Sequence, residues 1–260
     1  MVIDFKEYYK SMKVRGVFFA LPIIVLLILI LFSSNSAYSS NLVDVSWPNC
    51  KTNLIGTQYT YGIVGVTGGL DFKPNKCVGK EAGWMQYTAT YENTGYPGRY
   101  YGIKYKNYPL NCTVNNYLCL AYNYGYNSSL YSIGYASSQN VHSKYWWLDV
   151  ETDNSWTLNP LINRQVIKGS YYAIKNNVPF AVIGIYSDPP QWNYLTKNWQ
   201  PKIDEWAGTG ASNTYSAAVA CLEPSFTGGP ILISQYTINI DQNYICSSNY
   251  YKMFFVNNYL

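Results

Sequence analysis

The chain has 260 residues, of which 12% are charged and 48% apolar. This composition excludes a disordered protein. The length is sufficient to bury a sizeable core in one large or two small domains. Four of the 18 bases and two of the 14 acids lie before residue 16, which leaves 14 bases against 12 acids, a net charge of +2. This balance gives no reason to expect a nucleic acid or another polyanion as partner.

The first 40 residues predict a targeting segment. Residues 16–32 form an uncharged apolar run behind a basic stretch. The run is long for the core of a signal peptide and short for a bilayer span, so a cleaved signal and a retained membrane anchor both stay open. Because the bases lie only on its amino side, either one places residues 41–260 outside the cytoplasm, with a short cytoplasmic N-terminus if the anchor is kept. We therefore expect a domain over 41–260 that is secreted or held at the cell surface.

Six cysteines follow the apolar run, without a C-x-x-C pair and with a single His in the chain. This spacing favours disulfides over a zinc site. Fifteen pairings are possible, and we predict bridges between nearest neighbours: Cys50 with Cys77, Cys112 with Cys119, and Cys221 with Cys246. Two N-glycosylation sequons begin at Asn111 and Asn127.

Beyond residue 41, short runs rich in Val, Ile and Tyr alternate with polar or amphipathic stretches. The short runs predict eight strands, at 42–47, 61–67, 100–105, 145–151, 180–187, 203–208, 231–236 and 238–245. The stretches between them predict helices at 78–91, 120–140, 161–176, 190–198 and 215–222. The clearest of these helices follows Asn159 as cap and Pro160 in the first turn.

This alternation predicts an α/β fold in a single domain, for which an eight-stranded (β/α)8 TIM-like barrel fits the strand count and the length. A doubly wound sheet is the alternative. Its nucleotide-binding form is disfavoured, because neither Gly68-Gly69 nor Gly208-Thr209-Gly210 belongs to a G-x-G-x-x-G motif.

Acids inside apolar strands are the most informative feature of so weakly charged a chain. Asp149 and Glu151 lie two residues apart in YWWLDVET, so in an extended strand both point to one face. Two carboxyl groups held together raise the proton affinity of one, as the cleavage of glycosidic bonds requires. The alternative is an ion pair or an exposed strand end. In a closed barrel the first and last strands are neighbours, which would bring Asp44 and Asp241 to the same cavity.

Four motifs follow one another between residues 42 and 246: DVS at 44–46, LDVE at 148–151, GIYS at 184–187 and SQYTINIDQN at 234–243. Their order resembles that of the family 25 glycoside hydrolases, the lysozyme-type muramidases, and more closely that of their secreted glycoside-hydrolase-like relatives. The resemblance implies that Glu151 protonates the leaving oxygen, with Asp149 positioning or stabilising and Asp44 and Asp241 lining the sugar site. It also implies an N-acetylated cell-wall or surface glycan as substrate, with the N-acetyl group as internal nucleophile and no cofactor.

One departure concerns the second strand. Relatives often carry an acid after it, where this chain reads GVTGGLD at 65–71, so that position has no carboxylate unless Asp71 takes its place. Aromatic and amide side chains near predicted strand ends are candidates for sugar contacts: Tyr105, Tyr186, Trp206, Gln235 and Tyr236.

Two functions follow from these residues, an exported glycosidase or a barrel that binds glycan without turnover. A third possibility is a divalent cation held by the four acids, although we predict no metal. The oligomeric state is left open. The low charge also suits a protein exposed to acidic surroundings.

Overall fold

The computed structural model describes residues 42–52 and 59–248. The basic stretch, the apolar run and the domain boundary after residue 40 lie outside these ranges, so the signal or anchor stays a prediction. Among the described helices, none combines the length and the apolarity needed to cross a bilayer.

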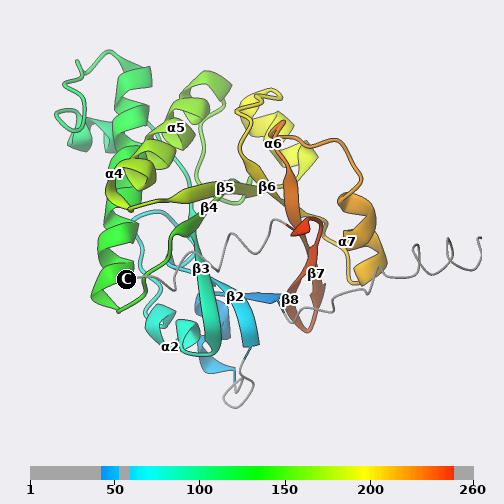
Figure 1. Cartoon of the computed structure of the whole chain (residues 1–260). Coiled ribbons are helices and arrows are strands. Elements are labelled where there is room, and N and C mark those ends of the chain that lie inside the picture. Colours follow the sequence, from blue (N-terminus) through cyan, green and yellow to red (C-terminus); the bar gives the residue numbers. More distant parts are fainter. Residues whose placement is uncertain (1–41, 53–58, 249–260) are drawn as a thin grey trace, which may run out of the picture. The chain divides into compact units, whose positions relative to one another are not determined.

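Eight strands close into a barrel in the order of the sequence, with the first strands (blue) beside the last (red) in Figure 1. Neighbours from β1 to β7 run parallel, whereas β8 is antiparallel to both β7 and β1. The strands are β1 (Leu42–Val45), β2 (Tyr59–Gly65), β3 (Met85–Asn93), β4 (Tyr145–Asp149), β5 (Val182–Ser187), β6 (Asp204–Gly208), β7 (Ile231–Ile238) and β8 (Ile240–Ile245).

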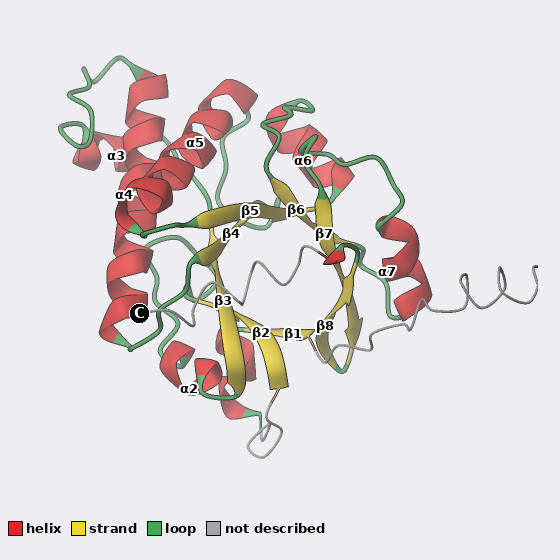
Figure 2. Cartoon of the chain, viewed as in Figure 1, coloured by secondary structure: helices red, strands yellow, loops and turns green. Residues whose placement is uncertain are grey.

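Helices surround the barrel (Figure 2). They are η2 (Trp47–Lys51), α2 (Val78–Ala82), α3 (Arg99–Gly102), η3 (Ile103–Tyr105), α4 (Tyr117–Ser138), α5 (Pro160–Asn177), α6 (Pro189–Thr196) and α7 (Thr214–Ala220). The α5 helix begins as predicted, because the Asn159 side chain accepts a hydrogen bond from the backbone of Leu161 and Pro160 occupies the first turn.

Side chains alternate between the two faces of each strand, which divides the core in two. In β4, Tyr145 and Trp147 belong to the cluster inside the barrel, whereas Trp146 and Leu148 belong to the cluster between strands and helices. The Trp147 ring lies 4.9 Å from that of Tyr145 and 5.6 Å from that of Trp206. Aromatic rings therefore fill the middle of the barrel and leave only its rim open to polar groups.

The predicted α/β barrel is confirmed, but its third strand lies elsewhere than expected. The predicted helix 78–91 ends at Ala82, and Met85–Asn93 forms β3 between β2 and β4. The predicted strand 100–105 consists of the helical turns α3 and η3, in which Tyr100 is 75% exposed. Residues 85–93 form a strand because their Tyr and Thr side chains favour an extended chain. In addition, closure of the barrel requires a strand between β2 and β4.

The eighth strand also departs from an all-parallel barrel. One residue, Asn239, joins β7 to β8 in a hairpin and adopts a φ of 63°. The start of β8 therefore lies beside the end of β7. This direction brings Asp241, near the start of its strand, to the same rim as Asp44, near the end of β1. In an all-parallel barrel the two acids would lie at opposite ends.

The three predicted disulfides are confirmed. Cys50–Cys77, Cys112–Cys119 and Cys221–Cys246 have Cα–Cα distances of 5.6, 5.7 and 5.1 Å. They join η2 to the residue before α2, the loop before α4 to its first turn, and the end of α7 to the end of β8. Such bridges persist in oxidising compartments and fit an extracellular location.

Candidate active site

A cavity of about 150 Å³ lies at the carboxyl ends of the parallel strands, and we refer to it as the acid cavity. In barrels of this kind the carboxyl rim is where substrates bind. None of the eight lining side chains is a base, and four are acids: the lining comprises Asp44, Tyr91, Asp149, Glu151, Tyr186, Trp206, Gln235 and Asp241. The four acids singled out in the sequence are thus placed in one cavity.

Asp44 points into the barrel from β1 and is 5% exposed. Its two carboxyl oxygens accept hydrogen bonds from Gln235 Nε2, at 2.9 Å, and from Asn243 Nδ2, at 2.8 Å. Burial, followed by the charge of Asp241, raises the pKa of Asp44 to about 8, although the two hydrogen bonds act in the opposite direction. Asp44 is therefore a neutral acid below that pH.

Asp149 ends β4 and is 4% exposed. Its Oδ2 accepts a 2.6 Å hydrogen bond from Asn93 Nδ2, and Asn154 Nδ2 donates to its backbone oxygen at 3.1 Å. Asn93 is itself held by the hydroxyl of Thr67, which donates to its Oδ1 at 2.8 Å. Burial, and then the charge of Glu151, raise the pKa of Asp149.

Glu151 follows β4 by two residues and is half-buried, so its carboxyl group is more accessible than that of Asp149. Burial raises the pKa of Glu151, and the charges of Asp153 and Asp188 add to the effect, whereas a hydrogen bond from Gln191 lowers it. Gln191 is oriented by its other contacts, because its Nε2 donates to Asp188 at 2.7 Å and its Oε1 accepts from Thr152 Oγ1 at 2.8 Å.

A hydrogen bond between the side chains of Asp149 and Glu151 raises the pKa of Asp149 and lowers that of Glu151. Two carboxyl groups in such contact bind a proton between them, because both cannot ionise without strong repulsion. Because the described residues that line the cavity include no base to offset their charge, the pair keeps that proton at a pH where isolated carboxyl groups have lost theirs. Both acids of the pair line the acid cavity.

Three aromatic rings and Gln235 form the rest of the described lining. The Trp206 ring centre lies 4.5 Å from that of Tyr186 and 6.1 Å from that of Tyr91. The Tyr186 hydroxyl donates to Gln235 Oε1 at 2.7 Å, and the same Gln235 donates to Asp44. The rings thus support a hydrogen-bonded chain that orients Asp44 in the cavity.

Comparison with known proteins bears on the fold. No protein-family model matches the chain, and no curated protein matches it in sequence. Solved structures of similar fold include the virulence factor GHIP, a glycosyl hydrolase 25 of Streptococcus pneumoniae participating in host cell invasion, with a TM-score of 0.51 and 14% identity over 83% of this chain and 93% of that one. The CTP1L endolysin, whose activity is regulated by a secondary translation product, has a TM-score of 0.54 and 12% identity over 81% of this chain and 67% of that one.

The chain has the GH25 lysozyme-like fold. The expected resemblance in fold is thereby confirmed, and the acid cavity occupies the carboxyl rim of that fold.

Two residues expected near sugar lie outside the acid cavity of this GH25 fold. Tyr236 follows the inward-facing Gln235, so the alternation of β7 turns it away, and its hydroxyl donates to Gln242 at 3.0 Å. Tyr105 lies in η3 rather than at a strand end and lines a different cavity, which also contains Asp71. Asp71 accepts a short hydrogen bond from the Tyr124 hydroxyl and does not line the acid cavity.

Sequence reasoning missed several groups that shape the cavity. Tyr91 and Asn93 occupy inward positions of β3. They were missed because the sequence predicted the third strand at 100–105 instead of at 85–93. The sequence does contain the period-two pattern of a strand, since Tyr87, Ala89, Tyr91 and Asn93 are every second residue and lie on one face. Asn154 and Gln191 come from loops and helix starts, for which no periodicity exists.

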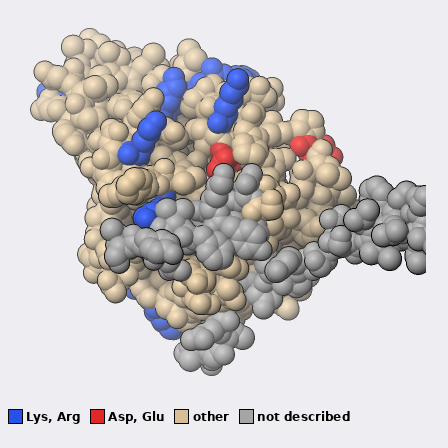
Figure 3. Space-filling model, viewed as in Figure 1, with Lys and Arg blue, Asp and Glu red and all other residues tan. Residues whose placement is uncertain are grey.

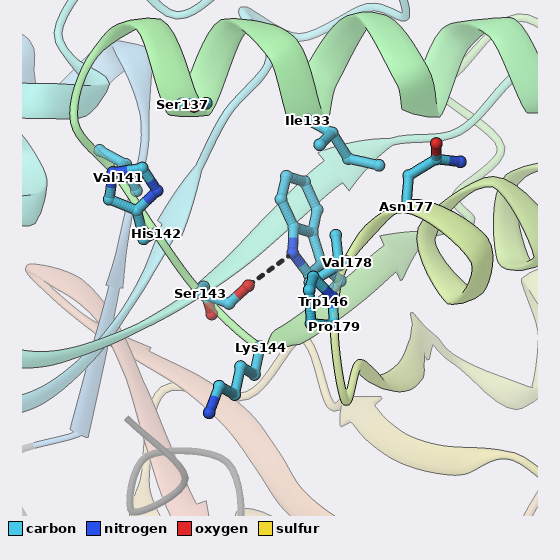
Figure 4. A pocket seen from close by; sticks show the side chains of 10 residues that line it. All are labelled: Ile133, Ser137, Val141, His142, Ser143, Lys144, Trp146, Asn177, Val178 and Pro179. Carbon is cyan, nitrogen blue, oxygen red and sulfur yellow. Dashed lines mark hydrogen bonds between the residues drawn. The ribbon is translucent and has the colours of Figure 1, made fainter. Parts of the chain in front are cut away.

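A larger cavity, of about 470 Å³, lies at the opposite end of the barrel (Figure 4). It is bounded by the residues before β4 and β5 and by α4, and Trp146 Nε1 donates to the Ser143 carbonyl at 3.0 Å beside it. Its ten described lining residues include His142 and Lys144 but no Asp or Glu. It therefore lacks the paired acids on which glycosidic cleavage depends.

The arrangement of the charged groups is seen in the described residues and on one face of the molecule. Among the described residues, no group of three or more His, Cys, Asp and Glu has an arrangement that could hold a metal ion. Basic side chains stand apart from one another on the described part of the face drawn in Figure 3, most of which is uncharged.

Proposed function

We propose that the chain is a glycosidase that cleaves an N-acetylated cell-wall or surface glycan, with Glu151 as acid and base and Asp149 as its supporting residue. The observation that supports the proposal is the hydrogen-bonded Asp149–Glu151 pair, which opens into a cavity completed by Asp44 and Asp241. Barrel hydrolases place their reacting carboxyl groups at this rim.

The chemistry assigns a different role to each acid. Glu151 is half-buried with a raised pKa, so it is suited to deliver its proton to the glycosidic oxygen as the bond to the sugar carbon breaks. The carbonyl oxygen of the substrate's own N-acetyl group then bonds to that carbon. Water, deprotonated by the ionised Glu151, opens the ring formed in this step and restores the acid. No protein nucleophile is needed.

Asp149 is the positioning partner in this scheme. It is almost fully buried and held by Asn93 and Asn154, so it has less freedom to reach the scissile bond than Glu151. In the proposed scheme its carboxyl group accepts a hydrogen bond from the N–H of the acetamide and orients that group for attack. Asp44, Asp241 and Gln235 contribute hydrogen-bonding groups for the sugar hydroxyls.

The location belongs to the same proposal. Three disulfides fit an oxidising compartment, and the apolar run behind a basic stretch is typical of an exported chain. We place the barrel outside the cell, secreted or anchored, where such glycans are found.

Substitution of the acid tests the assignment. Glu151→Gln keeps the shape of the side chain but cannot donate a proton, so we expect the release of reducing ends from purified wall polysaccharide to fall at least about 100-fold. Glu223→Gln is the matched control, because Glu223 is exposed and does not line the acid cavity. A Glu151→Gln protein that hydrolyses the polymer at the wild-type rate would disprove the role of Glu151.

A barrel that binds glycan without turnover is the second candidate. It is favoured by one observation, that Asp71 is engaged by Tyr124 and no side chain from the loop after β2 lines the acid cavity. In that case the wild-type protein is retained by the wall polysaccharide but releases no reducing ends, and Glu151→Gln leaves retention unchanged.

A further inference from the structure

A second cavity on the carboxyl side of the barrel has an aromatic lining. Its volume is about 360 Å³, and its walls include Asp71, Phe72, Tyr101, Lys104, Tyr105 and Ser155. We refer to it as the Tyr101 pocket. It contains the features expected of a binding site for a polar ligand with apolar faces: exposed ring surface, a carboxyl group and an amine close together.

The loop after β4 connects the Tyr101 pocket to the acid cavity. Ser155 lines the pocket, and its neighbour Asn154 donates to the backbone oxygen of Asp149 at 3.1 Å. Trp156 Nε1 donates to the backbone oxygen of Glu151 at 2.8 Å, which fixes the same loop. The residues that line the Tyr101 pocket and those that hold the backbone of the acid pair therefore follow one another in this loop.

A second connection runs along the segment after β1. The side chain of Ser46 is hydrogen-bonded to Tyr91, which lines the acid cavity. The next residue, Trp47, is 52% exposed and stands beside Gly69, one residue before Leu70 of the Tyr101 pocket. Trp47 therefore connects the segment after β1, which contacts Tyr91 of the acid cavity, with the loop that lines the Tyr101 pocket.

The walls of the Tyr101 pocket are held in place before any ligand binds. Phe72 and Tyr105 stack with ring centres 5.1 Å apart and an interplanar angle of 5°. Asn123 Nδ2 donates to the backbone oxygens of Tyr105 and Leu110, each at 2.7 Å. The Cys112–Cys119 disulfide ties the end of this loop to α4. A preformed site loses less conformational freedom on binding.

The polar groups of the pocket are equally well placed. Asp71 accepts a hydrogen bond from the Tyr124 hydroxyl, which leaves further lone pairs of its carboxyl group for other donors. The Lys104 amine lies 5.3 Å from the centre of the Tyr101 ring. Lys104 thus lies over the Tyr101 ring, and because Tyr101 is 43% exposed, the rest of that ring remains open to a ligand.

We propose that the Tyr101 pocket is a second sugar subsite, which holds another unit of the same glycan chain whose bond is cleaved at the acid cavity. The apolar C–H face of that sugar stacks on Tyr101, while its hydroxyl or acetamide groups bond to Asp71 and Lys104. The inference rests on the proposed function for the identity of the ligand. It adds that the protein prefers long glycans, because short ones cannot reach both cavities at once.

Binding measured in the Glu151→Gln protein tests this without turnover. Calorimetric titration with the hexamer and the dimer of β-1,4-linked N-acetylglucosamine supplies the two lengths. We expect Tyr101→Ala to weaken hexamer binding about tenfold, the effect of losing one stacked ring, and to leave dimer binding unchanged. Tyr105→Leu should act in the same direction, with unchanged thermal unfolding midpoints as evidence of an intact fold.

Tyr172→Ala is the matched control, because Tyr172 is also 43% exposed but lies on α5 and lines neither cavity. Equal hexamer affinity in the Tyr101→Ala and Tyr172→Ala proteins would overturn the subsite and leave the proposed function standing. Loss of hexamer binding in Tyr101→Ala with no reducing ends released by the wild type would uphold the subsite and overturn hydrolysis. If neither oligosaccharide binds, the subsite is rejected.

Discussion

At the scale of single residues, the site is governed by burial of acids without bases nearby. Asp44, Asp149 and Glu151 all have raised pKa values, and in each case removal of water from the carboxyl group is the largest cause. The sequence indicated these acids, because acids are rare in this chain and stand out inside apolar strands. Of their amide partners only Gln235 was among the predicted site residues; Asn93, Asn154 and Asn243 were not, since Asn and Gln are common here and carry no such contrast.

The role of Glu151 as proton donor can be tested by substitution of its neighbour Asp153. Glu151 must be protonated to act as the acid, so kcat/KM falls as the pH rises through the pKa of Glu151. Burial is the main cause of that raised pKa, and the charge of Asp153 adds to it. Asp153→Asn removes this charge without touching the carboxyl group, so we expect the alkaline limb of the pH profile to move to lower pH, and to move less in high salt.

Glu223→Gln serves again as the control and should leave the limb in place, because Glu223 is not among the groups that influence Glu151. An alkaline limb that stays fixed in Asp153→Asn, or moves upward, would contradict Glu151 as the acid.

At the scale of elements, the packing of α4 on α5 depends on two glycines. A Cβ at Gly125 would overlap the Val166 carbonyl, and a Cβ at Gly169 would overlap the Tyr122 carbonyl. Both helices were predicted from sequence within a few residues, but their close approach was not. Helix boundaries follow from caps and periodicity along one segment, whereas this contact joins two segments over 40 residues apart.

Substitution of a packed and of an unpacked glycine by alanine separates the effect of helix–helix packing on stability from that of helix propensity. Gly169→Ala should lower the free energy of unfolding by roughly 1–3 kcal/mol, since backbone atoms must move to admit the methyl group. Gly134→Ala, on an open face of α4, should instead raise it by about 0.5–1 kcal/mol. Urea unfolding with intact disulfides measures both. Opposite signs are the expected result, and equal effects would contradict the packing.

At the scale of the whole molecule, buried acids link stability to pH. Glu92 faces α4 from the outer side of β3, is 1% exposed and accepts a short hydrogen bond from Ser129. Burial raises its pKa from 4.5 to about 7. The native state therefore binds more protons than the unfolded state between these values, so the free energy of unfolding falls as the pH rises from 4.5 to 7.

Glu92→Gln removes this ionisable group and keeps a similar shape. As the pH rises from about 4.5 to about 8, the free energy of unfolding of the variant should increase relative to that of the wild type by up to roughly 3 kcal/mol. This is the free energy that corresponds to the shift in the pKa of Glu92. Denaturant titrations at several pH values measure the difference. Wild-type and variant curves that run parallel across this range would show that Glu92 does not contribute.

Several properties of the protein follow from the sequence by itself: the alternation of strands and helices, the nearest-neighbour disulfides, and the acids at strand ends. Each depends on residues close together in the chain, so composition and spacing suffice. The tertiary structure alone decided that 85–93 is the third strand, that Tyr91 and Asn93 line the cavity, and that Tyr236 faces outward. It also set the direction of β8, which brings Asp241 beside Asp44. These features depend on hydrogen bonding between distant strands, and no local pattern specifies which strands will pair or in which direction.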